Sequence, residues 1–136
     1  MRIELLKIDF NSDEAIYIQL RNQIIMCIAT SHIREGDTLP SVRQLAEDIG
    51  INMHTVNKAY AVLKGEGILS LDRRRGAVVC IDKDKVLALA ALKDNLRITL
   101  AKGCCQEISI NEVHALIDEI FAEHQWITRR GNHYEE

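Results

Sequence analysis

The sequence lacks any apolar run long enough to cross a membrane, which takes about 18 residues or more. Its first ten residues mix Arg2, Glu4, Lys7 and Asp9 with apolar residues, unlike the apolar core of a signal peptide. We therefore expect a soluble, cytoplasmic protein with no membrane partner.

Paired cysteines with the spacing of a zinc ribbon or a thioredoxin motif are also lacking. The four cysteines are Cys27, Cys80, Cys104 and Cys105. We expect reduced thiols that are mostly packed inside the fold. A metal sensor built on His114 and His124 is the alternative, but their spacing of ten positions is almost three helical turns, too far for joint ligation. We predict no metal site and no cofactor.

The sequence has no internal repeat, no Pro-rich or Ser-rich linker, and no arrangement typical of a catalytic nucleophile and its base. Gly65-Glu66-Gly67 has neither the spacing nor the lysine of a P-loop. With 136 residues, 47% of them hydrophobic, the chain is long enough for one modest core and a small helical appendage. These features argue against an enzyme.

An excess of positive charge is missing too, because the net charge is −3. The charge is unevenly distributed, however. Residues 51–80 carry five basic and two acidic side chains, a local net charge of +3, whereas residues 81–136 have a net charge of −3. The middle of the chain is therefore the candidate nucleic-acid surface, and the acidic C-terminal part has another role.

Helical periodicity is clear in the first half of the chain. Apolar residues recur at helical spacing from Ala15 to Ser31, and Gly36 and Pro40 then interrupt the pattern. Ser41 and Gln44 have the spacing of a capping box, which predicts a second helix up to Asp48 or Ile49.

A tight turn follows this second helix. Gly50 suits the left-handed position after a helix, and Asn52 suits the N-cap of the next one. In that third helix Val56, Ala59, Tyr60 and Leu63 form one stripe, which leaves a polar face opposite. Two helices joined by a short turn with glycine are typical of a helix-turn-helix.

Two β-prone runs come next, Ile68–Asp72 and Ala77–Ile81, after Gly65 and Gly67 close the third helix. They flank Arg73, Arg74, Arg75 and Gly76. We predict a hairpin with a basic tip.

Two more helices are expected in the C-terminal part. Asp82 is the expected N-cap of a helix that runs through Lys102 and stops at Gly103, and Ser109 with Glu112 forms a capping box for the last helix. The polar tail beyond Ile127 is expected to fray. The predicted dimerisation residues are Leu89, Leu92, Leu96, Leu100, Val113, Ile117, Ile120 and Phe121. A private core for each chain is the alternative, but two helices alone bury little surface, so pairing of two subunits is favoured.

The polar face of the third helix has the chemistry that reads base edges in the major groove. The basic hairpin tip suits the phosphate backbone or the adjacent minor groove. Arg43, in the first turn of the second helix, is expected to contact phosphate rather than a guanine. The predicted DNA-binding residues are Ser41, Arg43, Asn52, His54, Thr55, Asn57, Lys58, Arg73, Arg74, Arg75 and Gly76.

The same residues carry a family resemblance over residues 10–80. The motifs are Leu39-Pro40-Ser41-Val42-Arg43-Gln44-Leu45-Ala46, Gly50-Ile51-Asn52, Thr55-Val56, Leu63 and Glu66-Gly67-Ile68, with Ile16-Tyr17, Gln19-Leu20 and Gly36-Asp37 before them. This pattern resembles the GntR family of bacterial regulators, which implies DNA contacts at the second helix, the third helix and the wing from Arg73 to Gly76. Met53 and Arg74 depart from the residues that many members carry, so the operator sequence does not transfer from relatives.

The short C-terminal part resembles that of the YtrA-like subfamily, whose members often repress operons for ABC transporters. The predicted fold class is mainly α with a small β-hairpin: a winged helix-turn-helix over residues 1–81, then a two-helix dimerisation segment over residues 82–136. The expected function is a dimeric repressor bound to a palindromic operator in double-stranded DNA, with a small-molecule effector left open. The alternative is a winged-helix module that binds a protein and never touches DNA.

Overall fold

The computed structural model describes residues 3–127, which fold into two compact units. The first unit holds Met1–Asp82 and the segment that starts at Trp126, and the second holds Lys83–Gln125. No helix among the described residues is long and apolar enough to span a membrane. The predicted fraying tail beyond Ile127 lies outside the described residues.

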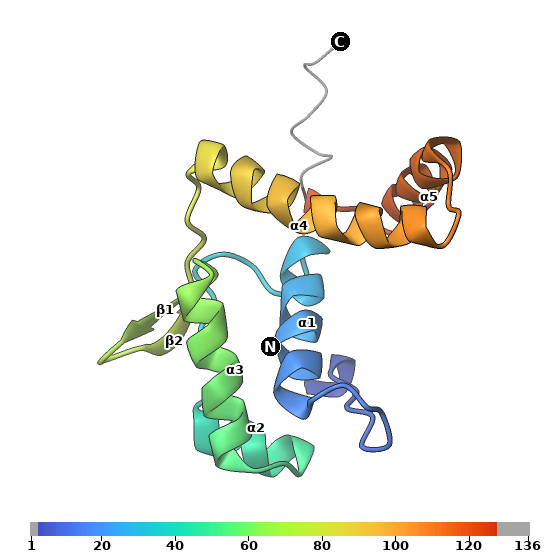
Figure 1. Cartoon of the computed structure of the whole chain (residues 1–136). Coiled ribbons are helices and arrows are strands. Elements are labelled where there is room, and N and C mark those ends of the chain that lie inside the picture. Colours follow the sequence, from blue (N-terminus) through green and yellow to red (C-terminus); the bar gives the residue numbers. More distant parts are fainter. Residues whose placement is uncertain (1–2, 128–136) are drawn as a thin grey trace. The chain divides into compact units, whose positions relative to one another are not determined.

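Three helices and a hairpin make up the first unit (Figure 1). In chain order it contains a short 3-10 turn η1 (Ile3–Leu5), α1 (Ile16–Ala29), α2 (Val42–Ile49), α3 (Met53–Gly65), β1 (Leu69–Asp72) and β2 (Gly76–Val79). The core of this unit contains residues from α1, α2, α3 and the hairpin. Leu20, Ile24, Leu45, Val56 and Leu63 are completely buried. This is the mainly helical winged helix-turn-helix that the sequence predicts.

The turn between α2 and α3 forms as the residue types predict. Gly50 takes the left-handed conformation, with φ +81°, and its N–H bonds to the carbonyl oxygen of Ala46. The Asn52 Oδ1 accepts the N–H of His54 at 2.7 Å and caps α3. The predicted capping box at Ser41 forms only in part: Ser41 Oγ accepts the Gln44 N–H at 3.1 Å, but the Gln44 side chain donates to Asp48 Oδ1 instead of turning back.

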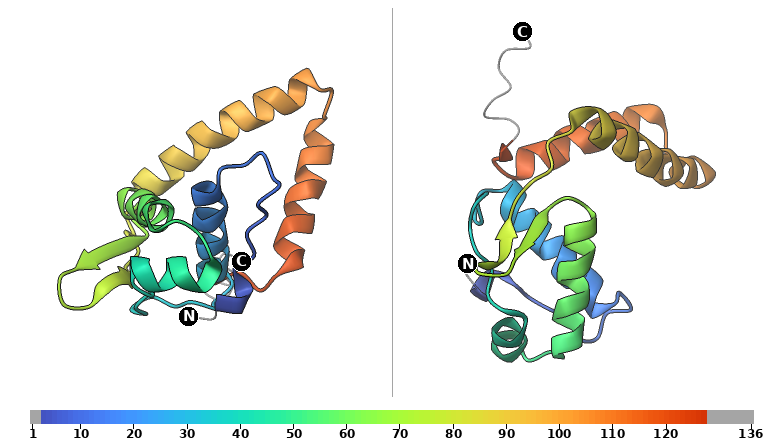
Figure 2. Two further views of the ribbon diagram at one scale, coloured as in Figure 1. Left: turned by 90° about the horizontal axis from the view of Figure 1, so that it is seen from below. Right: turned by 90° about the vertical axis from the view of Figure 1, so that its left-hand side faces the viewer.

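The strands β1 and β2 pair antiparallel, with Leu69 opposite Val79 and Asp72 opposite Gly76. They are shorter than predicted, because Ile68 and Ile81 lie outside them. The loop that precedes α2 runs along the free edge of β2, with a bridge between Thr38 and Val78. The hairpin is therefore joined to the rest of the unit along one side, while its tip projects outward (Figure 2).

An apolar groove lies on the first unit and is lined by residues from distant parts of the sequence. Trp126 and Ile127 border it together with Ile25, Ile28 and Ala29 of α1 and with Ile68 and Ile81 near the hairpin. Trp126 is half-buried there.

The second unit consists of α4 (Lys85–Cys105) and α5 (Ile110–Glu123), which meet at a sharp elbow (Figure 2). Two details of the prediction are wrong. The N-cap of α4 is Asp84, whose side chain accepts the N–H of Leu87, because the N–H of Asp82 is bonded to Gly67 and stays with the hairpin. The helix also continues through Gly103 and ends at Cys105. Gln106 is its C-cap, and Glu107 takes the left-handed conformation with φ +65°.

The capping box of α5 is confirmed. Ser109 Oγ accepts the Glu112 N–H at 3.1 Å, and Glu112 Oε1 accepts the Ser109 N–H at 2.9 Å. These two backbone bonds lower the pKa of Glu112 below its ordinary value, because they favour the charged carboxylate.

The prediction of mostly packed cysteines is wrong. All four thiols are free, but only Cys27 is buried, and Cys80, Cys104 and Cys105 are exposed. Cys104 and Cys105 lie at the end of α4, in which no side chain is buried, and Cys80 directly follows β2.

Candidate nucleic-acid interface

The helix α3 separates its apolar and polar residues as predicted. Val56, Ala59, Tyr60 and Leu63 are buried against α1 and α2. The opposite face is open to solvent: His54, Asn57, Lys58 and Ala61 are exposed and Thr55 is half-buried. Short polar side chains thus lie on the first two turns of α3, where the helix dipole also favours a nearby phosphate.

Two residues of this polar face have internal partners. The Oδ1 of Asn52 is occupied by the cap of α3, but its amide N–H groups remain able to donate. The Nζ of Lys58 lies 4.2 Å from the centre of the Tyr17 ring on α1. This cation–π contact holds the ammonium group at the edge of the exposed face.

The start of α2 is fixed next to α3. The hydroxyl of Tyr60 donates to the carbonyl oxygen of Pro40 at 2.7 Å, directly before the Ser41 cap. Burial raises the pKa of Tyr60, so this hydroxyl keeps its proton and its hydrogen bond. The bond sets the position from which Ser41 and Arg43 project. Both are exposed, and in the described part of the chain no hydrogen bond or ion pair holds the Arg43 guanidinium.

The tip of the wing has a defined turn. Asp72 Oδ1 accepts the N–H of Arg74 at 2.7 Å and that of Arg75 at 3.1 Å, and Gly76 takes a left-handed φ of +81°. These N–H bonds, helped by the nearby Arg75 charge, lower the pKa of Asp72. A side-chain acceptor at the start of the turn and a glycine at its end fix its shape.

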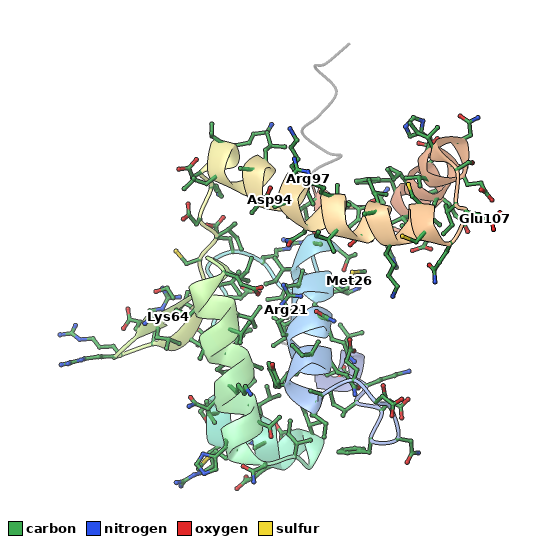
Figure 3. The ribbon with its side chains drawn as sticks, in the orientation of Figure 1. Arg21, Met26, Lys64, Asp94, Arg97 and Glu107 are labelled. Atoms are coloured by element: carbon green, nitrogen blue, oxygen red, sulfur yellow. The ribbon has the colours of Figure 1, made fainter. Side chains whose placement is uncertain are left out.

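All three wing arginines are exposed, and Figure 3 shows nitrogen-bearing side chains that extend outward from the hairpin tip. Their side chains differ in one respect. Arg75 Nη2 donates to the carbonyl oxygen of Gly36 at 2.9 Å. Within residues 3–127, neither Arg73 nor Arg74 uses its guanidinium in a hydrogen bond or ion pair.

Sequence reasoning missed the contacts that position this surface, which Tyr17, Tyr60 and Asp72 make. The role of Asp72 could have been predicted from the sequence, because aspartate is typical at the first position of a turn and Gly76 is typical of the residue that follows one. The roles of Tyr17 and Tyr60 could not, since their partners lie far away along the chain.

The ion pair between Arg21 and Glu66 is another long-range contact of this kind. Arg21 Nε and Nη2 donate to the two carboxylate oxygens of Glu66 at 2.9 and 2.6 Å. The pair joins α1 to the residue that follows α3, and it raises the pKa of Arg21. It thereby supports the helix that carries the polar face.

The second unit carries the predicted dimerisation residues on its surface. Leu89, Leu92, Leu96 and Leu100 of α4 are between 39% and 56% exposed. On α5, Ile117, Ile120 and Phe121 are also exposed and Val113 is half-buried. A shallow groove along α4 is lined by these four leucines, and a second one between α4 and α5 is lined by Leu100, Val113 and Ile117 among others.

A helix-turn-helix formed by α2 and α3, with an exposed polar face on α3 and a basic hairpin after it, defines a winged-helix protein of the DNA-binding class. Residues 14–79 match the model of the bacterial regulatory proteins of the gntR family. The chain is also 31% identical over 122 residues to the HTH-type transcriptional repressor YtrA of Bacillus subtilis, an alignment that covers 88% of this chain and 94% of that protein.

Solved structures agree with this assignment. A transcriptional antiterminator from Listeria monocytogenes has 28% identity and a TM-score of 0.74, over 84% of this chain and 87% of that one. YtrA from Sulfolobus acidocaldarius, a GntR-family transcription factor, has 39% identity and a TM-score of 0.56, over 68% of this chain and 98% of that one. The chain belongs to the GntR family and is a YtrA-like, DNA-binding transcription regulator.

Proposed function

We propose that the protein is a dimeric repressor that binds a palindromic operator through α3, the start of α2 and the wing. The observation that carries this proposal is that one unit holds both the exposed polar half of α3 and two exposed arginines, Arg73 and Arg74, whose guanidinium groups have no acceptor within residues 3–127. A solvated helix face alone is common on protein surfaces. A polar helix N-terminus together with a basic wing matches both grooves of a DNA duplex.

Each candidate residue has a role in this proposal. Asn57 and His54 face the base edges, and Thr55 offers its methyl and hydroxyl groups. The amide of Asn52 and the ammonium of Lys58 lie at the margins of α3 and serve the phosphates. Ser41 donates its remaining hydroxyl proton to phosphate beside Arg43, while Gly76 allows the wing backbone to approach DNA closely.

The second unit supplies the dimer. In α4 and α5 no side chain is buried, although their leucines and isoleucines form stripes along each helix. Association of two copies removes this apolar surface from water, at a gain of roughly 25 cal/mol per Å². In a symmetric dimer the two copies of α3 enter successive major grooves about 34 Å apart. Residues 1–81 then bind DNA, and α4 and α5, within the predicted segment 82–136, hold the subunits together.

Repression is supported by the name of the Bacillus subtilis relative, and control of a transporter operon rests on the resemblance to the YtrA-like subfamily alone. A dimer seated over a promoter excludes RNA polymerase. A small-molecule effector would act by changing the dimer. We also propose that the protein is cytoplasmic and binds its operator there.

The test is a binding titration of the protein against the promoter region of its own operon at two salt concentrations, with a scrambled duplex as control. We expect tight, salt-sensitive binding to the promoter and weaker binding to the scrambled duplex. Equal weak binding to both would contradict the proposal. Binding to a protein partner without salt dependence would favour the interaction module.

A further inference from the structure

The guanidinium of Arg75 is turned back toward the body of the first unit. Its Nη2 donates to the carbonyl oxygen of Gly36 at 2.9 Å, across 39 residues of sequence. Gly36 itself has a left-handed φ of +92°, and it lies in the loop between α1 and α2. A residue at the tip of the wing is thus bonded to the loop that leads into the helix-turn-helix.

This bond extends an existing ladder. The N–H of Gly36 donates to Val79 at 2.8 Å, the N–H of Val79 donates to Asp37 at 2.9 Å, and the N–H of Leu39 donates to Ala77 at 2.8 Å. These three bonds pair the loop with β2 from Val79, at the base of the hairpin, to Ala77, near its tip. The Arg75 side chain adds a fourth attachment, which runs from the tip of the wing to the Gly36 carbonyl at the base end of this ladder.

The charge of Arg75 is also placed differently from that of its neighbours. Its target lies between two acidic residues, Glu35 and Asp37, and its charge acts on Asp72 at the start of the turn. The loop around Gly36 and the turn of the wing, which Arg75 joins, therefore carry three carboxylates. Arg73 and Arg74 have no such acceptor within residues 3–127, so their charges are available to phosphate.

We propose that Arg75 is a positioning residue, which fastens the wing to the loop at Gly36, and that Arg73 and Arg74 alone supply the wing's charge to the DNA backbone. This inference rests on the proposed function, and it divides three consecutive arginines into two roles. A fastened wing presents its two free arginines with less loss of conformational entropy on binding.

The test compares Arg73→Ala, Arg74→Ala and Arg75→Ala in the full chain. Each variant is titrated with the promoter duplex over a range of salt, and amide hydrogen exchange is measured without DNA. Loss of a phosphate contact lowers the salt slope by about one. We expect that change for Arg73→Ala and Arg74→Ala. Arg75→Ala keeps the parent slope and loses roughly three- to ten-fold in affinity at every salt concentration.

Hydrogen exchange supplies the readout that does not depend on DNA. In Arg75→Ala the amides of Gly36, Leu39 and Val79 should exchange faster than in the parent, whereas Arg74→Ala should leave them unchanged. The proposal is overturned if Arg75→Ala lowers the salt slope as much as the other two variants and leaves these amides protected. If the parent protein does not bind DNA, the proposed function fails, and the exchange rates still decide whether Arg75 fastens the wing.

Discussion

The two units of this protein use similar apolar residues with opposite results. In the first unit, side chains from α1, α2, α3 and the hairpin close a single core, in which Leu20, Ile24, Leu45 and Leu63 have no exposed surface. In the second unit, α4 has leucines at regular helical spacing, yet none of them is buried. The apolar pattern alone does not distinguish a closed core from an exposed stripe. The number of elements that pack around the pattern makes the difference.

This difference predicts how stability depends on protein concentration, and the largest effect is expected in the core. Leu63→Ala should lower the free energy of unfolding by about 2–5 kcal/mol, because it leaves a cavity among α1, α2 and α3. The matched variant Leu96→Ala should have an effect that grows with protein concentration, since Leu96 is exposed in the single chain and becomes buried in the proposed dimer. Chemical denaturation at two protein concentrations measures both. A concentration-independent effect of Leu96→Ala would mean that α4 belongs to a private core.

A charge on the α4 stripe tests the interface directly. Leu96→Glu should weaken dimerisation at least roughly 30-fold, because an unpaired carboxylate would have to leave water. Sedimentation should then report a species near the chain mass of 15.4 kDa instead of twice that mass. Ile98→Glu is the control: Ile98 is 72% exposed and lies off the leucine stripe, so this variant should remain dimeric.

The helix caps give a smaller contrast between the units. Ser41→Ala removes the cap of α2 and should lower the free energy of unfolding by about 1 kcal/mol at any protein concentration. Ser109→Ala removes the capping box of α5. It should lower the free energy of unfolding by a similar amount, but only under conditions where the proposed dimer forms. Thermal unfolding over a dilution series separates the two. Identical behaviour of both variants would argue that the units unfold as one.

The smallest expected effect is the pH dependence that Glu112 gives to the second unit. The folded-state pKa of Glu112 is depressed below its ordinary value of 4.5, so its contribution is present above that pH and is lost as the pH falls through the lower folded-state value. The stability difference between the parent and Glu112→Gln should therefore shrink on acidification. Thermal midpoints at pH 7 and pH 3 measure it, and a difference that persists at pH 3 would contradict the assignment.

Rules based on neighbouring residues predicted the parts of this protein that depend on hydrogen bonds between neighbouring residues. The caps at Ser41, Asn52 and Ser109 and the left-handed Gly50 follow from bonds within a few residues, and all four form. The N-cap of α4 was misplaced because a distant bond from Asp82 to Gly67 competes with it. The positioning contacts Tyr60 to Pro40 and Arg75 to Gly36 span 20 and 39 residues, and no spacing rule reaches that far.

Trp126 gives the protein an optical reporter of its own. It is the single tryptophan in the sequence, and it sits in the apolar groove of the first unit, beside Ile28 of α1 and Ile81. An indole in such surroundings fluoresces at shorter wavelength than one in water, and collisional quenchers reach it slowly. Emission from the unlabelled protein therefore follows the packing of Trp126 against α1 while operator DNA, salt or small molecules are added.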